Sequence, residues 1–106
     1  MITITEDGQP LALEVIKRPY SLGGTRIDLY DDDGPYMTLS VCVTNEEAEV
    51  TSADLPKGRF YLKSWSENES VARELLGNET LKIDMTYPPV TLGFCQAWVA
   101  YFVEDV

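Results

Sequence analysis

One stretch of the sequence, residues 59–77, joins a strand pattern to the only strong helix pattern in the chain. In its first part, Phe60 and Leu62 alternate with polar neighbours, which is the period of a strand with one buried face. In its second part, four apolar residues recur at helical spacing: Val71, Ala72, Leu75 and Leu76. A single helix of about three turns is unstable alone in water, so it must pack against a sheet.

Both ends of this helix carry sequence signals. Ser66 stands three residues before Glu69, the spacing of a capping box, in which each side chain bonds the other residue's free backbone N–H. Gly77 follows the last apolar position and predicts a left-handed stop. We therefore expect the strand to pass directly into a capped helix.

The remaining sequence predicts a sheet. Alternating apolar and polar residues predict strands over residues 2–5, 11–16, 25–30, 36–43, 81–85 and 94–103, with an additional short edge segment around Ala48 and Val50. The residues of 31–35, Asp-Asp-Asp-Gly-Pro, predict a tight turn and an antiparallel hairpin. The last strand is apolar on both faces, so we expect it to be central and covered on both sides. The predicted fold class is α+β: one domain over 1–106, with a mainly antiparallel sheet of about five to seven strands and a single helix packed on one face.

The charge balance limits the possible partners. Eighteen Asp and Glu face eight Lys and Arg, with no histidine, which gives a formal net charge of −10. Such a surface repels nucleic acid and anionic membranes and attracts basic partners. The start of the sequence has no secretory signal, and no apolar run is long enough to span a bilayer. We therefore predict a cytoplasmic protein with no direct nucleic-acid or membrane binding; a purely solubilising role for the acidic residues stays open.

The sequence does not favour an enzyme. Histidine, the commonest general base, is absent, and Cys42 and Cys95 have no such residue to activate them. We expect both cysteines to be reduced and buried in strands. The 31–33 aspartates lack the spacing and the closing Glu of a calcium loop, and four zinc ligands are not available. The sequence predicts no catalytic residue, no cofactor and no metal.

Four aromatic residues stand out because of their predicted positions. Tyr30 and Tyr36 flank the Asp-rich turn, while Tyr61 and Trp65 fall on the polar face of the strand before the helix. Tyrosine and tryptophan often anchor interfaces. Packing beneath a loop or a helix edge is the alternative, and for Trp65 it is the favoured one.

Two segments, D-D-D-G-P-Y-M-T-L-S-V-C-V and L-P-K-G-R-F-Y-L-K-S-W-S-E-N-E, followed by a Leu-rich helix, resemble a family of small uncharacterised proteins. Phages, plasmids and integrative elements of bacteria carry that family. Residues 27–76 bear the resemblance, at the following matching positions: Pro35, Tyr36, Leu62, Lys63, Ser66, Glu67 and Asn68. The resemblance implies a mobile-element origin and brings no catalytic residue. Small acidic proteins of such origin often inhibit host defence, and some are anti-CRISPR proteins that occupy nucleic-acid-binding surfaces.

Together, charge and resemblance lead to one hypothesis: a non-enzymatic, anti-CRISPR-like binding protein that occupies a basic nucleic-acid-binding surface of a host protein in the bacterial cytoplasm. Its carboxylates would imitate phosphates. The expected partner-binding residues are Asp31, Asp32, Asp33, Tyr36, Glu46, Glu47, Glu49, Glu67 and Glu69. A monomer and a homodimer are both compatible with the sequence. The alternative is an accessory or structural protein of the mobile element whose acidic surface serves only solubility.

Overall fold

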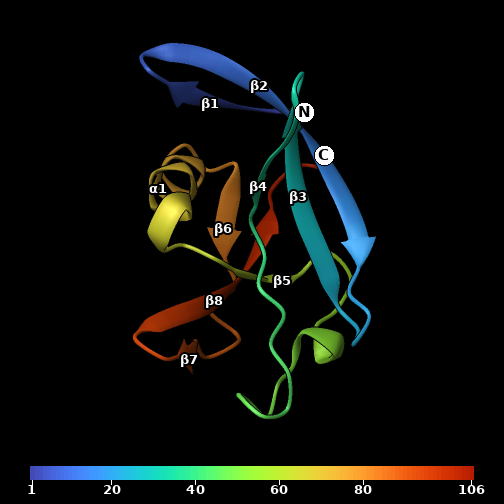
Figure 1. The fold of residues 1–106 in the computed structure, drawn as a ribbon. Coiled ribbons are helices and arrows are strands. Elements are labelled where there is room, and N and C mark those ends of the chain that lie inside the picture. The colour runs from blue at the N-terminus through green and yellow to red at the C-terminus, as the bar shows by residue number, and fades with distance from the viewer.

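The computed structural model describes residues 1–106 as eight strands in two antiparallel sheets with a single α-helix, which confirms the α+β class (Figure 1). The first sheet has the order β1-β2-β3-β4, formed by consecutive hairpins. Its strands are β1 (Ile2–Glu6), β2 (Gln9–Pro19), β3 (Thr25–Asp31) and β4 (Gly34–Thr38). The β3–β4 pair is the predicted antiparallel hairpin, since Asp31 lies opposite Gly34 across its turn.

The second sheet is organised around its last strand. Its members are β5 (Phe60–Leu62), β6 (Leu81–Ile83), β7 (Val90–Leu92) and β8 (Cys95–Phe102). β5, β6 and β7 all pair antiparallel with β8. The prediction that an apolar strand near the end of the sequence is central is therefore confirmed.

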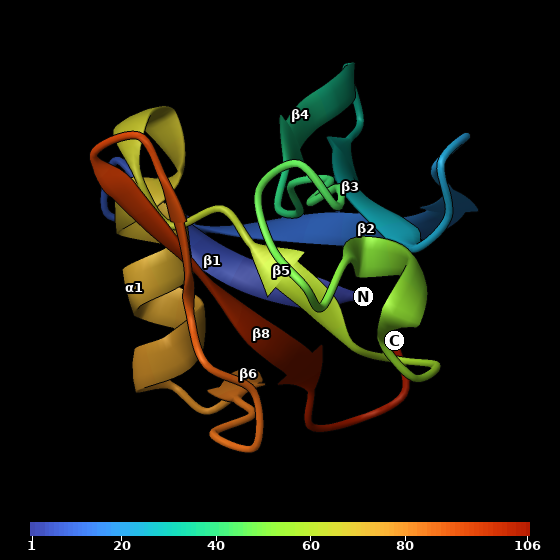
Figure 2. The ribbon, with the colours of Figure 1, turned by 90° about the horizontal axis from the view of Figure 1, so that it is seen from below.

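One helix, α1 (Glu69–Gly77), follows the 3-10 turn η2 (Ser66–Asn68). It lies beside β1 and β6, and the turned view in Figure 2 shows it along one side of the molecule. Both carboxylate oxygens of Glu74 accept the backbone N–H of Thr5, at 3.0 and 2.8 Å, which ties the β1–β2 hairpin to the helix. The single helix thus fastens the two sheets together at one edge.

Two apolar clusters fill the interior. The larger one lies between the sheets and α1 and contains residues from both sheets and the helix, among them Leu13, Leu29, Leu62 and Leu75. The smaller one lies beneath the segment that connects β4 to β5, and its members are Val43, Tyr61, Val90, Ala97 and Val99. β8 contributes to both clusters, which explains why its two faces are apolar.

The structure corrects the predicted length of the fourth strand. β4 ends at Thr38, although the alternating pattern continues to Val43. Beyond Thr38 the chain passes from one sheet to the other: the N–H of Leu39 donates to Ile27 in the first sheet, and the N–H of Val41 donates to Tyr61 in the second. The period of two persists because the backbone stays extended while its hydrogen-bond partners change.

Other boundaries differ for local reasons. The predicted edge segment around Ala48 and Val50 is a turn followed by the 3-10 turn η1 (Ser52–Asp54). β7 was missed because it has only three residues and follows two prolines, and Phe94 lies in the β7–β8 turn rather than in a strand. Met85 lies beyond the end of β6 and is exposed. Both cysteines are free, as the sequence predicts, but they are half-buried and Cys42 lies outside the strands.

The predicted helix caps are also wrong. Ser66 makes no capping bond and instead has φ +55°, so it turns the chain between β5 and the helix. Gly77 lies inside the last helical turn, and Glu79 takes the left-handed conformation with φ +64°. The entry of the helix is therefore fixed by a left-handed serine, a feature that a capping pattern does not reveal.

Ser66→Ala is accordingly expected to leave stability within about 0.5 kcal/mol of the parent, since the Oγ makes no hydrogen bond to lose. Ser66→Gly is expected to raise stability by roughly 0.5 kcal/mol, because glycine adopts positive φ without the steric cost that a Cβ imposes. Urea denaturation of both variants is the measurement. A loss of about 1 kcal/mol in the alanine variant would instead restore the capping-box interpretation.

Candidate functional site

Most of the acidic side chains have no cationic partner. Ion pairs engage five of the eighteen, which leaves thirteen unpaired. Several of these occupy two places at opposite ends of a molecule whose longest dimension is 40 Å (Figure 1). One place is the β3–β4 turn, and the other is the loop of residues 44–50. The two acidic segments identified in the sequence therefore form separate patches.

The β3–β4 turn holds its aspartates in different environments. The Oδ1 of Asp31 accepts the backbone N–H of Asp33 at 2.7 Å, so this half-buried carboxylate closes the turn. Gly34 follows with φ +118°, a conformation that glycine adopts without strain. Asp32 and Asp33 are exposed and make no ion pair, so they are the two carboxylates of this turn that are available to a partner.

Tyr36 is influenced by a set of acidic residues from separate segments, which the sequence did not predict. Burial raises the pKa of its phenol, and four nearby carboxylates raise it further: Glu6, Asp31, Asp7 and Glu74. They come from the end of β1, the β1–β2 turn, the end of β3 and the helix. We call these four residues the Tyr36 acidic cluster. Tyr36 itself is half-buried and packs against the larger core, so its role at this site is mainly structural.

The loop at the other end carries Glu46, Glu47 and Glu49, all exposed. The carboxylate of Glu47 accepts a hydrogen bond from the hydroxyl of Thr44. The backbone N–H of Glu47 donates to the carbonyl of Thr44. This local turn fixes one carboxylate. Glu46 and Glu49 form no ion pair and remain free at the surface.

The two acids at the start of the helix are less available than the sequence suggests. Glu67 forms an ion pair of 2.7 Å with Lys63, and Glu69 forms one of 2.6 Å with Arg73. The hydrogen bond from Lys63 lowers the pKa of Glu67, so this carboxylate stays charged but already faces a cation. Neither residue lies in the β3–β4 turn or the 44–50 loop.

The aromatic residues are mostly structural. Tyr61 is buried rather than on a polar face, and its hydroxyl donates to the carbonyl of Val50 at 2.7 Å. Trp65 packs against the smaller core, which is the favoured alternative from the sequence. Tyr30 accepts a hydrogen bond of 2.8 Å from Arg18. We therefore exclude Tyr61 as a surface anchor.

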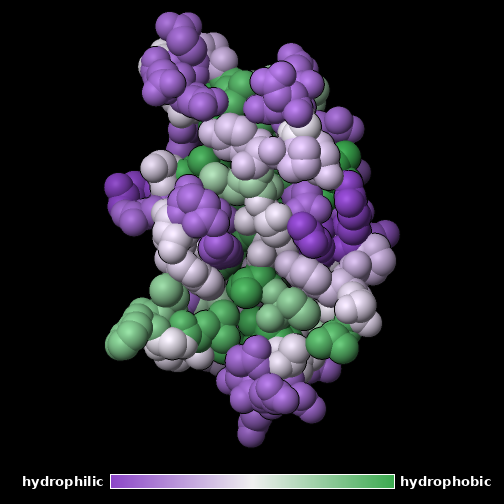
Figure 3. All heavy atoms as spheres, viewed as in Figure 1, coloured by the Kyte–Doolittle hydropathy of each residue, from purple (hydrophilic) through white to green (hydrophobic).

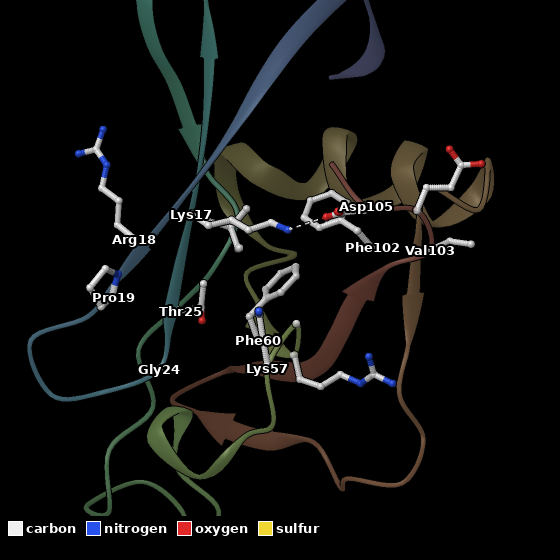
Figure 4. Close-up of a pocket in the computed structure, with 14 residues that line it drawn as sticks. Lys17, Arg18, Pro19, Gly24, Thr25, Lys57, Phe60, Phe102, Val103 and Asp105 are labelled. Atoms are coloured by element: carbon white, nitrogen blue, oxygen red, sulfur yellow. Dashed lines mark ion pairs between the residues drawn. The ribbon is translucent and has the colours of Figure 1, made fainter.

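Basic residues gather at one place in this acidic protein. A cavity of about 560 Å³ opens between the two sheets, and four of the eight basic residues line it: Lys17, Arg18, Lys57 and Arg59 (Figure 4). We call it the basic cleft. The sequence contains the signal only as two separate short basic segments, and nothing in their spacing indicates that the fold brings them together.

No group of three or more His, Cys, Asp or Glu side chains is placed to hold a metal ion. In the 31–33 turn, the Asp31 side chain is used by the backbone instead. The single helix is too short to cross a membrane.

Apolar side chains form the remaining surface feature. Figure 3 shows them gathered over the lower part of one face, where Figure 1 places β7 and β8, with hydrophilic residues at both ends. Phe94, in the β7–β8 turn, is fully exposed. A smaller groove of about 340 Å³ lies between α1 and the second sheet, lined mainly by apolar residues that include Trp98 and Met85.

Comparison with known proteins gives no further guide to this surface: no family model, no curated protein and no solved structure matches the chain.

Proposed function

We propose that this protein is a non-enzymatic acidic binding protein that occupies a basic surface on a nucleic-acid-binding partner. The observation that carries the proposal is the placement of unpaired carboxylates on short turns at both ends of an elongated domain. Anionic groups held on hairpin turns lose little freedom on binding, so Arg and Lys of a partner gain more from them than from flexible chains.

The end with the Tyr36 acidic cluster is the stronger half of the proposed surface. Four carboxylates lie close enough to Tyr36 to raise its pKa, and the exposed side chains of Asp32 and Asp33 lie on the adjacent turn. Like charges held together repel one another, and a basic partner relieves that repulsion. The 44–50 loop at the other end supplies a second contact to an extended basic surface.

The resemblance of residues 27–76 to small proteins of phages, plasmids and integrative elements suggests who the partner is. Under that resemblance the partner is a host defence protein that binds nucleic acid, and the chain acts as an anti-CRISPR-like inhibitor in the bacterial cytoplasm. The functional contacts proposed here are narrower than the sequence predicted, since Glu67 and Glu69 are already ion-paired.

The proposal is tested by capturing the partner from a bacterial host lysate and measuring its association with three double variants at low salt. Asp32→Asn/Asp33→Asn and Glu46→Gln/Glu49→Gln are each expected to slow association by about threefold to tenfold, with unchanged melting temperature. The matched control is Glu14→Gln/Glu79→Gln, which also removes two unpaired exposed carboxylates, but outside both ends. The differences are expected to shrink at high salt.

If the two end variants associate as fast as the control, the acidic surface serves only solubility. The alternative, an accessory or structural protein of a mobile element, then gains weight. One observation favours it: an exposed Phe94 beside an apolar surface is typical of assembly contacts. Binding through that surface would persist as salt rises, whereas binding through carboxylates would weaken.

A further inference from the structure

The basic cleft reverses the charge of the protein over a small area. Its lining includes four cationic side chains and two anionic ones, Glu104 and Asp105, for a local formal charge of +2 in a chain of −10. An excess of one sign of charge in a concave site attracts ions of the opposite sign. The acidic surface of the rest of the protein does not account for this local excess of positive charge. The positive charge of the cleft therefore needs a separate explanation.

Two of the four cations are already engaged. The Nε of Arg59 donates to Asp84 at 2.9 Å, and its guanidinium lies 4.0 Å from the ring centroid of Tyr101. Hydrogen bonds from Thr86 and Arg59 lower the pKa of Asp84, which keeps this pair charged. Arg18 donates to the hydroxyl of Tyr30, and Figure 4 shows its guanidinium directed away from the two phenylalanines of the cleft.

The two lysines are the available cations. Lys57 forms no ion pair, and Lys17 lies 4.0 Å from Asp105, the longest ion pair in the molecule. The Lys17 side chain is 40% exposed and Asp105 is fully exposed, so water screens this contact and it contributes little. A stronger anion can therefore replace Asp105 beside Lys17 (Figure 4).

The cleft also contains an apolar surface suited to a ring. Phe102 is half-buried and offers part of its ring to the cleft, whereas Ile27 and Phe60, whose ring centroid lies 5.8 Å from that of Phe102, are almost fully buried in the core. The Nζ of Lys17 lies 5.9 Å from the Phe102 centroid, so cation and aromatic surface are adjacent. A volume of about 560 Å³ is within the range of small-molecule sites, which are apolar with a few placed polar groups.

We propose that the basic cleft binds a small anion with an aromatic body. The ring packs against the exposed part of Phe102, and the anionic group lies between Lys17 and Lys57, where it displaces the carboxylate of Asp105. Carboxylate, sulfonate and phosphate share this chemistry, and a cleft of this size accepts a fused two-ring molecule. This site does not involve the acidic residues at the two ends of the molecule, so its test is independent of the test of the proposed function.

The test uses 8-anilinonaphthalene-1-sulfonate as the probe and follows its fluorescence during titration of the folded protein. Lys17→Gln and Lys57→Gln are each expected to weaken binding about fivefold, because each removes one charge near the sulfonate. Lys82→Gln, an exposed lysine without an ion pair outside the cleft, is the matched control and is expected to change nothing. Asp105→Asn is expected to strengthen binding, since the competing carboxylate loses its charge.

Two further measurements separate this site from general apolar binding. Phe94→Ser is expected to leave the affinity unchanged; loss of binding in that variant would place the probe on the exposed apolar surface and overturn the proposal. Competition by 2-naphthoate and by adenosine monophosphate distinguishes carboxylate from phosphate ligands, and displacement by either supports the site. Equal displacement by inorganic phosphate at the same concentration would refute the aromatic part, and equal affinities of the Lys17, Lys57 and Lys82 variants would refute the whole.

Discussion

Leu75→Ala is expected to lower the free energy of unfolding by about 2–5 kcal/mol, a large part of the stability of a domain of this size. Leu75 is fully buried in the larger core, at the place where α1 meets the sheets. Its removal leaves a cavity in a core that both sheets and the helix build, and such a cavity closes only in part. Urea denaturation followed by far-UV circular dichroism measures the loss.

The neighbouring residue provides the control. Leu76→Ala makes the same chemical change in the same helical turn, so any effect of helix propensity is equal. Leu76 is only half-buried at the edge of the core, and it lines the 340 Å³ groove. We expect a loss of less than half that of the Leu75 variant. Equal losses would mean that the helix packs with a different face toward the sheets.

Gly24→Ala is also expected to lower the free energy of unfolding by about 2–5 kcal/mol. A Cβ at this position would stand 2.6 Å from the Cβ and 2.8 Å from the carbonyl of Ser52 in η1. Ser52 cannot move away easily, because its backbone N–H and its Oγ both bond the backbone of Val43, each at 2.8 Å. Gly24 also has φ +90°, which adds strain to the steric overlap. Thermal and urea denaturation are the measurements.

Gly8→Ala separates these two causes. Gly8 also has positive φ, at +77°, but no atom lies within 4 Å of the position its Cβ would take. The strain of a left-handed alanine is then the only cost, about 1–2 kcal/mol. The excess loss in the Gly24 variant measures the close approach of the 20–24 loop to η1. If both variants lost the same amount, that approach would not contribute to stability.

The hairpins were predictable because their signals are local. The strand periods of β1, β2 and β3 and the turn residues of 31–35 lie within a few positions of one another, so the sequence contains what the fold uses. The central place of β8 was also predictable, since apolar residues on both faces need cover on both sides. The change of sheet after Thr38 was not, because it alters hydrogen-bond partners without altering the pattern.

The helix shows a second limit. Its apolar stripe was correctly identified, with Val71, Ala72 and Leu75 buried. The Ser66–Glu69 spacing fits a capping box, but Ser66 has φ +55° and makes no capping bond. The backbone conformation in the folded protein therefore does not follow the local capping-box signal.

The candidate sites divide in the same way. The acidic segments Asp31–Asp33 and Glu46–Glu49 can be recognised in the sequence. The structure shows which of their carboxylates already accept hydrogen bonds within the protein. The Tyr36 acidic cluster and the basic cleft are assembled from distant segments, so only the packing of the two sheets reveals them.

The dependence of three strands on β8 has a kinetic consequence. The hairpins of the first sheet close short loops, so each can form early and by itself. β6 has no strand partner except β8, and β5 reaches β8 only across the helix and β6 in the sequence. Pairing of β5 and β6 with β8 closes longer loops than the hairpins of the first sheet do, so it costs more entropy. It also cannot occur before β8 is in place. We therefore expect folding in two stages: the amides of the first sheet and of the short β7–β8 hairpin are protected early, and those of β5 and β6 are protected later, when these strands join β8.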